Sequence, residues 1–71
     1  MSDIVFEVFG RMSSEQELMH IGYVNAPGVE LAKVYAHTVY NEENWIELCV
    51  VKREDIIPVY NVEEKLNIKG N

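Results

Sequence analysis

The stretch Ile4-Val5-Phe6-Glu7-Val8-Phe9 decides how this chain folds, because it is apolar on both of its sides. Side chains alternate across a β-strand. One side therefore carries Ile4, Phe6 and Val8, and the other carries Val5 and Phe9. Such a strand needs apolar cover on both faces. It therefore predicts a central position in a sheet, with residues 4–11 forming the strand.

A second stretch, residues 45–52, predicts another strand that is apolar on both sides. Its two sides are Ile46, Leu48 and Val50 on one, and Trp45, Cys49 and Val51 on the other. Between the two stretches, residues 29–40 carry apolar side chains at steps of three and four, which predicts one amphipathic helix. One helix shields one face of a sheet. The other face needs a second protein surface, or it remains an apolar patch of the kind that marks an interaction site.

The remaining segments complete an α+β fold of the order ββαβ. They are a polar hairpin loop at 12–17, a strand at 18–24, an acidic turn at 41–44 and one helical turn at 53–57. In the strand at 18–24, alternation predicts Met19, Ile21 and Tyr23 on one face and Leu18, His20, Gly22 and Val24 on the other. The simplest topology is a three-stranded antiparallel sheet of order 2-1-3, with the helix on one face and a right-handed crossover.

The chain of 71 residues predicts one domain, at residues 1–57. Residues 58–71 form a C-terminal extension that we expect to be partly frayed, with a short extended piece at 59–62. So short a chain buries a small fraction of its surface, and small domains often compensate with disulfides, metals or self-association. The lone cysteine, Cys49, excludes an internal disulfide. The sequence therefore favours an optimised core or a homo-oligomer.

The charge balance disfavours nucleic acid and membrane partners. Twelve Asp and Glu stand against six Lys and Arg, whereas phosphate contacts need clustered basic residues. No apolar run approaches the length of a spanning helix, and the first residues carry no positive targeting region. A single unpaired cysteine fits a reducing compartment. These features predict a cytoplasmic protein.

Candidate chemical groups are few, and each has a structural interpretation that we favour. His20 and His37 lack a carboxylate at a ligand spacing, and Cys49 lies in an apolar strand without a neighbouring base. Glu7 interrupts an oily strand, and we expect it to be paired with Arg11, a neighbouring strand or a partner chain, since a buried carboxylate is otherwise expensive. The sequence thus predicts no catalytic, cofactor or metal site.

The segments Glu7-Val8-Phe9-Gly10-Arg11 and His20-Ile21-Gly22 resemble the opening signature of the phenylacetate-degradation protein B (PaaB) family. The resemblance covers about residues 4–57 and includes the helix positions Ala32, Ala36 and Tyr40. It departs from the family pattern at 41–43, where basic residues are usual and this chain is acidic. The family consists of small non-catalytic subunits of ring-1,2-phenylacetyl-CoA epoxidase, a multicomponent oxygenase of aromatic compound catabolism.

The resemblance implies an accessory subunit that contacts the catalytic and structural subunits of an oxygenase and associates with itself. We expect a partner interface on the sheet face that the helix leaves open, formed by Val5, Glu7, Phe9, Arg11, His20, Trp45, Cys49 and Val51. The alternative is a small homodimeric ligand-binding or regulatory domain, whose dimer forms a pocket around Tyr23, Tyr35 and Trp45. A metal- or cysteine-dependent enzyme is the least favoured interpretation.

Overall fold

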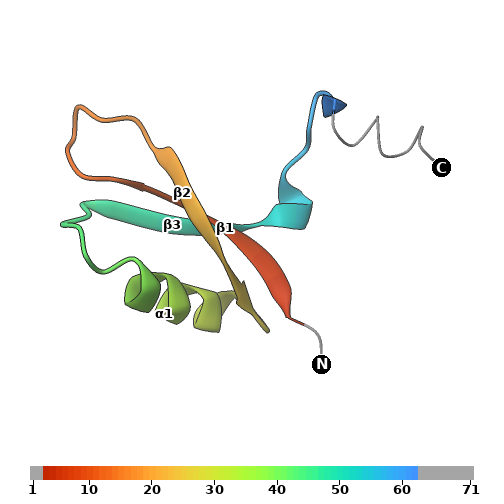
Figure 1. Cartoon of the computed structure of the whole chain (residues 1–71), viewed down its shortest axis with the longest axis horizontal. Helices are drawn as coiled ribbons and strands as arrows, with labels where there is room; N and C mark the ends of the chain where they lie inside the picture. The colour runs from red at the N-terminus through yellow and green to blue at the C-terminus, as the bar shows by residue number, and fades with distance from the viewer. Residues whose placement is uncertain (1–2, 63–71) are drawn as a thin grey trace.

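The computed structural model describes residues 3–62 and confirms the predicted α+β class. Its elements are β1 (Ile4–Arg11), β2 (Met19–Ala26), α1 (Val29–Val39), β3 (Glu47–Lys52) and a short 3₁₀ helix, η1 (Arg53–Asp55). The strands form one antiparallel sheet of order β2-β1-β3, and α1 lies along one side of it (Figure 1). The predicted frayed residues 63–71 lie outside the described part.

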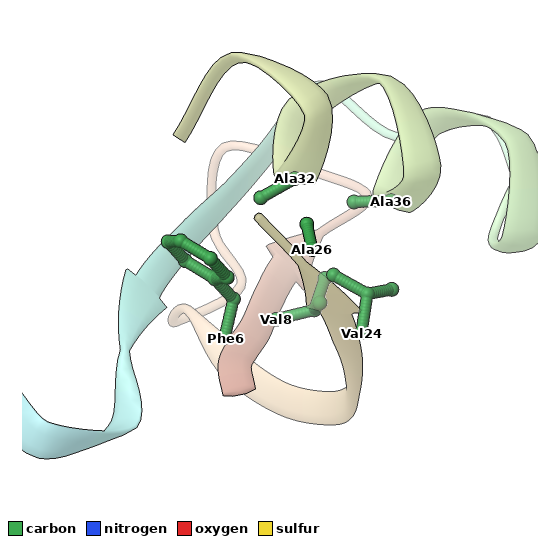
Figure 2. Packing of buried hydrophobic residues seen from close by; sticks show 6 residues of the cluster. All are labelled: Phe6, Val8, Val24, Ala26, Ala32 and Ala36. Carbon is green, nitrogen blue, oxygen red and sulfur yellow. The ribbon is translucent and has the colours of Figure 1, made fainter. Parts of the chain in front are cut away.

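The core lies between α1 and the side of the sheet that carries the even-numbered residues of β1. It consists of Phe6, Val8, Val24, Ala26, Ala32 and Ala36, each no more than 6% exposed (Figure 2). Alanine is the only residue type that α1 contributes to this set, so the helix approaches the sheet closely. Leu48 and Val50 of β3 pack against the edge of the core, as their predicted orientation requires.

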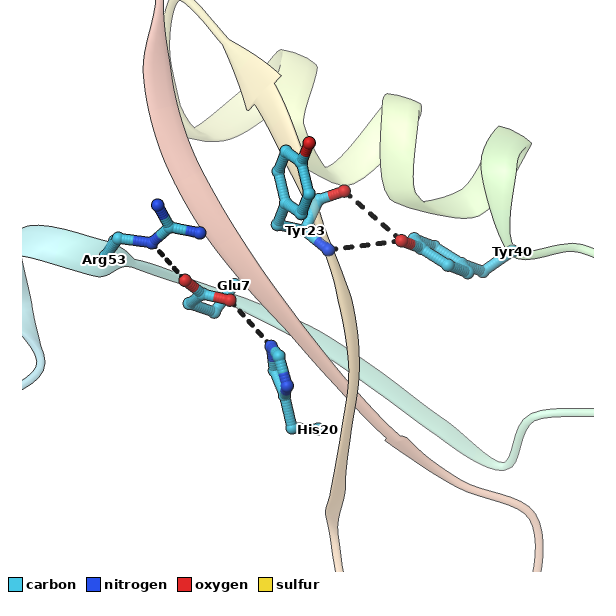
Figure 3. Close-up of polar contacts among 5 residues, drawn as sticks. All are labelled: Glu7, His20, Tyr23, Tyr40 and Arg53. Carbon is cyan, nitrogen blue, oxygen red and sulfur yellow. Dashed lines mark hydrogen bonds and ion pairs between the residues drawn. The ribbon is translucent and has the colours of Figure 1, made fainter. Parts of the chain in front are cut away.

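Two strand glycines make room for aromatic rings on the helix side of the sheet. A Cβ atom at Gly22 would lie 2.0 Å from the hydroxyl oxygen of Tyr40, and one at Gly10 would lie 2.9 Å from the ring of Trp45. The Tyr40 hydroxyl accepts a hydrogen bond from the Tyr23 N–H at 3.2 Å and donates to the Tyr23 carbonyl at 3.3 Å (Figure 3). The indole N–H of Trp45 donates to the Tyr40 carbonyl at 2.5 Å.

The third strand begins two residues later than predicted, at Glu47, and this changes the position of Trp45. Its ring lies over Gly10 on the helix side, so its predicted place beside Cys49 and Val51 is wrong. Ile46, predicted to face the helix, is 55% exposed. Strand alternation does not extend to these two residues because they belong to the connection that follows α1.

The predicted alternation of the second strand is also wrong, because the pairing of β1 with β2 contains a bulge. Val8 pairs with Gly22, but Phe9 pairs with His20, so Ile21 has no partner in β1. An extra residue of this kind shifts every later side chain to the opposite face. As a result, His20 and Tyr23 share one side of the sheet, and Ile21 packs against the core.

The close approach of Tyr40 to Gly22 gives a prediction. Gly22→Ala should lower the free energy of unfolding by about 1–3 kcal/mol, because the added methyl group forces the Tyr40 ring away from the strand. The matched control is Gly28→Ala, where an added Cβ meets no atom within 4 Å and the cost should stay below about 1 kcal/mol. Urea denaturation measures both. Equal stability of Gly22→Ala and the wild type would contradict this packing.

Candidate functional site: the open sheet face

The side of the sheet opposite α1, here called the open sheet face, is the candidate site. Cross-strand partners share a face, so the register places its members together. They are Val5, Glu7, Phe9 and Arg11 of β1, His20, Tyr23 and Asn25 of β2, and Glu47, Cys49 and Val51 of β3. This set includes every residue of the predicted partner interface except Trp45.

The middle of the open sheet face is apolar and partly exposed. Val5, Phe9, Cys49 and Val51 are all of intermediate exposure, in contrast to the fully buried Phe6 and Val8 on the other side. The segment at residues 56–62, which follows η1, projects away from the body of the protein (Figure 1). Its side chains Ile57 and Val59 are 89% and 94% exposed, which shows that they pack on neither face.

The buried carboxylate of Glu7 holds together three segments on this face. Glu7 is 8% exposed, and its Oε1 atom lies 2.7 Å from Nε2 of His20 on β2. Its second oxygen accepts a hydrogen bond from the Nε–H group of Arg53 in η1 (Figure 3). Both carboxylate oxygens are therefore occupied, which offsets the cost of burying the charge.

These contacts set the protonation state of Glu7. Burial by itself raises the pKa of this carboxyl group, but the hydrogen bonds from Arg53 and His20, together with the charges of both, outweigh that effect. The pKa of Glu7 consequently lies below its usual value. The group is ionised at neutral pH, and each of its two oxygens already accepts a hydrogen bond.

The partners of Glu7 also cover neighbouring aromatic rings. The His20 ring lies 5.2 Å from that of Phe9 at an angle of 56°, and the Arg53 guanidinium lies 5.6 Å from the centre of the Tyr23 ring. The Arg53 contact has the geometry of a cation–π interaction. The open sheet face thus combines an apolar centre with a bound network of charges around Glu7.

The prediction that Glu7 is paired is confirmed, but Arg11 is not its partner. Arg11 donates instead to Glu47 at 2.6 Å, its direct cross-strand neighbour. Arg53 was missed from the sequence, although a signal exists. Val51 is the cross-strand partner of Glu7, and Arg53 follows it by two residues, so knowledge of the register would have placed Arg53 diagonally beside Glu7.

The other candidate groups do not form a reactive centre with one another. His20 belongs to the open sheet face, whereas His37 lies beside Leu48 on the helix side. Burial, and secondarily the charge of Glu47, raises the pKa of the Cys49 thiol, which opposes formation of the nucleophilic thiolate. Among residues 3–62, no group of three His, Cys, Asp or Glu side chains is placed to hold a metal ion.

The three aromatic residues of the alternative ligand pocket do not line one hollow within a chain. Tyr23 and Tyr35 line a depression between β2 and α1, together with Val39. Trp45 lines a separate depression at the end of α1, beside His37 and Tyr40. The arrangement therefore offers no common aromatic pocket for a small ligand in one protomer.

Comparisons with known proteins return no relative of this chain: no family model, curated protein or solved structure matches it. Within residues 3–62, no helix is long and apolar enough to cross a membrane.

The Glu7 network gives a prediction about stability and pH. Glu7→Gln should lower the free energy of unfolding by about 1–2 kcal/mol at pH 7, a modest value because Arg53 and His20 are about half exposed. Since the folded-state pKa of Glu7 is lowered, its stabilising effect is complete above the ordinary carboxyl pKa. It should disappear as the pH falls through the lowered value.

Urea denaturation of both proteins between pH 7 and pH 2 measures this effect. The wild type and Glu7→Gln should converge in stability at acid pH. The matched control is Glu47→Gln, which removes a carboxylate whose side chain is 46% exposed, against 10% for that of Glu7, and should cost less at pH 7. A pH-independent difference between the wild type and Glu7→Gln would show that the ionised carboxylate is not what stabilises the fold.

Proposed function

We propose that this chain is a non-catalytic accessory subunit that acts through protein–protein contacts on its open sheet face. The observation that carries the proposal is the composition of that face. Its partly exposed apolar centre is flanked by ionic groups that are already paired. Interface cores are depleted of unpaired charge and are surrounded by polar rims, so this pattern suits a contact surface.

The ionisable groups of the face support a structural role over a catalytic one. A general base or a nucleophile needs a free, correctly protonated group. Glu7 is ionised but has both oxygens bonded, and the raised pKa of Cys49 keeps its thiol protonated at neutral pH. We therefore assign Glu7 and Cys49 a role in stabilising the surface and not in catalysis.

The residues that resemble the phenylacetate-degradation protein B signature are also joined by structural contacts. Glu7 and His20 belong to the two halves of that signature, and they bond to each other. Gly22, which ends the second half, provides the space for Tyr40. The signature positions thus join β1 to β2 and allow the C-terminal end of α1 to pack on β2. This is consistent with a role in shaping a subunit surface.

On this basis we propose a role similar to that of the B subunit of ring-1,2-phenylacetyl-CoA epoxidase, in the cytoplasm. The partner at the open sheet face would be a second copy of this chain or an oxygenase subunit. A second copy is the simpler partner to test, because it requires no other component. Contact between two such faces would bury the apolar centres of both.

A charge at the centre of the open sheet face should prevent self-association. Phe9→Asp, and independently Val5→Asp, should raise the dissociation constant of the homo-oligomer at least tenfold, equivalent to about 1.4 kcal/mol, by placing an unpaired charge in the contact. Sedimentation at micromolar concentrations measures this, with far-UV circular dichroism to verify the fold. Val34→Asp, which alters an exposed apolar residue on α1, is the matched control.

A wild-type protein that remains a monomer at these concentrations would contradict self-association through this face. Unchanged association of both Asp variants would show that the contact lies elsewhere. To test an oxygenase subunit as the partner, the wild type and Phe9→Asp can be compared in co-purification with the products of neighbouring genes.

A further inference from the structure

The two outer edges of the sheet differ in whether another strand has access to them. On β2, the Tyr40 hydroxyl bonds to both main-chain groups of Tyr23, near the middle of the strand. On β3, the outer edge has no strand beside it among residues 3–62, because β3 pairs with β1 alone. An unpaired edge is a template for an added strand. The accessible template in this chain is β3.

An apolar groove of about 430 Å³ accompanies this edge on the helix side, between α1 and β3. Val29 and Ala36 of α1 line it together with Leu48 and Val50 of β3, and the exposed Lys33 stands at its margin. A strand added at β3 directs alternate side chains toward this side of the sheet. The groove therefore provides space for the side chains of such a strand.

The segment at residues 56–62, here called the arm, has a composition that suits a strand added beside β3. It contains no charged residue, and its large side chains are exposed, with Ile57 at 89%, Val59 at 94% and Tyr60 at 76%. Its alternation gives two apolar sides, as a strand covered on both faces requires. Residues 57–61, which belong to no helix or strand of the described chain, nearly match β3 in length, at five residues against six. Pro58 has no backbone N–H to donate, so its backbone nitrogen would lie on the edge of the added strand that points away from β3.

The arm leaves its own chain on the wrong side of the sheet to enter its own groove. Arg53 is bonded to Glu7 on the open sheet face, and Ile56 and Pro58 line a hollow beside the same carboxylate. The groove lies on the opposite side, under α1. The contact between η1 and β1 would have to be released for the arm to reach the outer edge of its own β3. A second copy supplies an arm without that cost.

We propose that the groove between α1 and β3 binds the arm of a second copy, which pairs with β3 as an added strand. Main-chain hydrogen bonds to β3 would provide the attachment, and the apolar side chains of the arm would fill the groove. This contact uses the outer edge of β3 and the groove on the helix side, which shares only Cys49 with the open sheet face, so it does not depend on the function proposed above.

Cross-linking between differently labelled copies tests the proposal. One chain carries Lys33→Cys and the other carries Val59→Cys or Tyr60→Cys, all in a Cys49→Ser background, and the mixed pair is treated with a short thiol cross-linker. Strand geometry places residues 59 and 60 on opposite sides. We therefore expect one of the two positions to give at least fivefold more product with position 33 than the other. The matched control replaces Lys33→Cys with Glu42→Cys, in an exposed turn that does not line the groove.

Two results would overturn the proposal. One is a yield at both arm positions no greater than that of the Glu42→Cys control. The other is efficient cross-linking within a single chain carrying both cysteines at a concentration where it is monomeric, since the arm would then occupy its own groove. Phe9→Asp in both partners separates the two surfaces. Persistence of the cross-link in that variant, even where association through the open sheet face is lost, supports the arm contact.

Discussion

A sheet has two faces, and the described part of this chain supplies a single long helix to cover them. That constraint determines how the rest of the structure is arranged. The side under α1 receives the fully buried residues Phe6 and Val8, with alanines on the helix to allow close packing. The other side keeps apolar residues at intermediate exposure, and it places its buried charge, Glu7, between Arg53 and His20, which bond to its two oxygens. Within the described residues, one whole face of the sheet is thereby left without a helix over it.

Most of the fold could be predicted because it depends on local periodicity. Alternation over residues 4–11 and three- to four-residue spacing over 29–40 identify a central strand and an amphipathic helix, and chain order then leaves few antiparallel topologies. The bulge opposite Phe9 could not be predicted in this way. It depends on the pairing register between two strands, which the sequence of either strand alone does not specify. For this reason the sequence did not predict that His20 and Tyr23 lie on the same side of β2.

The site was predicted in part, for a related reason. Val5, Phe9, Cys49 and Val51 follow from alternation, so their shared face was foreseeable. The ion pairs were not, because they depend on register between segments distant in sequence. Arg11 lies on the same side of the strand as Glu7, but four residues of strand separate their Cα atoms by about 13 Å. The cross-strand neighbour Glu47 is nearer to it, and Arg53 is left for Glu7.

The network around Glu7 also links the covered and uncovered parts of the molecule. It joins β1 to β2 through His20 and to η1 through Arg53, so it fixes the direction in which the chain leaves the sheet. Tyr40 performs a comparable task on the other side, where its hydroxyl holds the main chain of Tyr23. The Glu7 network and the Tyr40 hydroxyl thus fix the strands, the end of α1 and η1 relative to one another.

The raised pKa of Cys49 has a consequence for the durability of the protein. Peroxides and disulfides react with thiolates, and a thiol that stays protonated at neutral pH reacts slowly with either. Cys49 is the only cysteine in the sequence, so it is the only thiol at this surface, and it reacts slowly. Cys49 should therefore be oxidised more slowly than an exposed thiol of ordinary pKa.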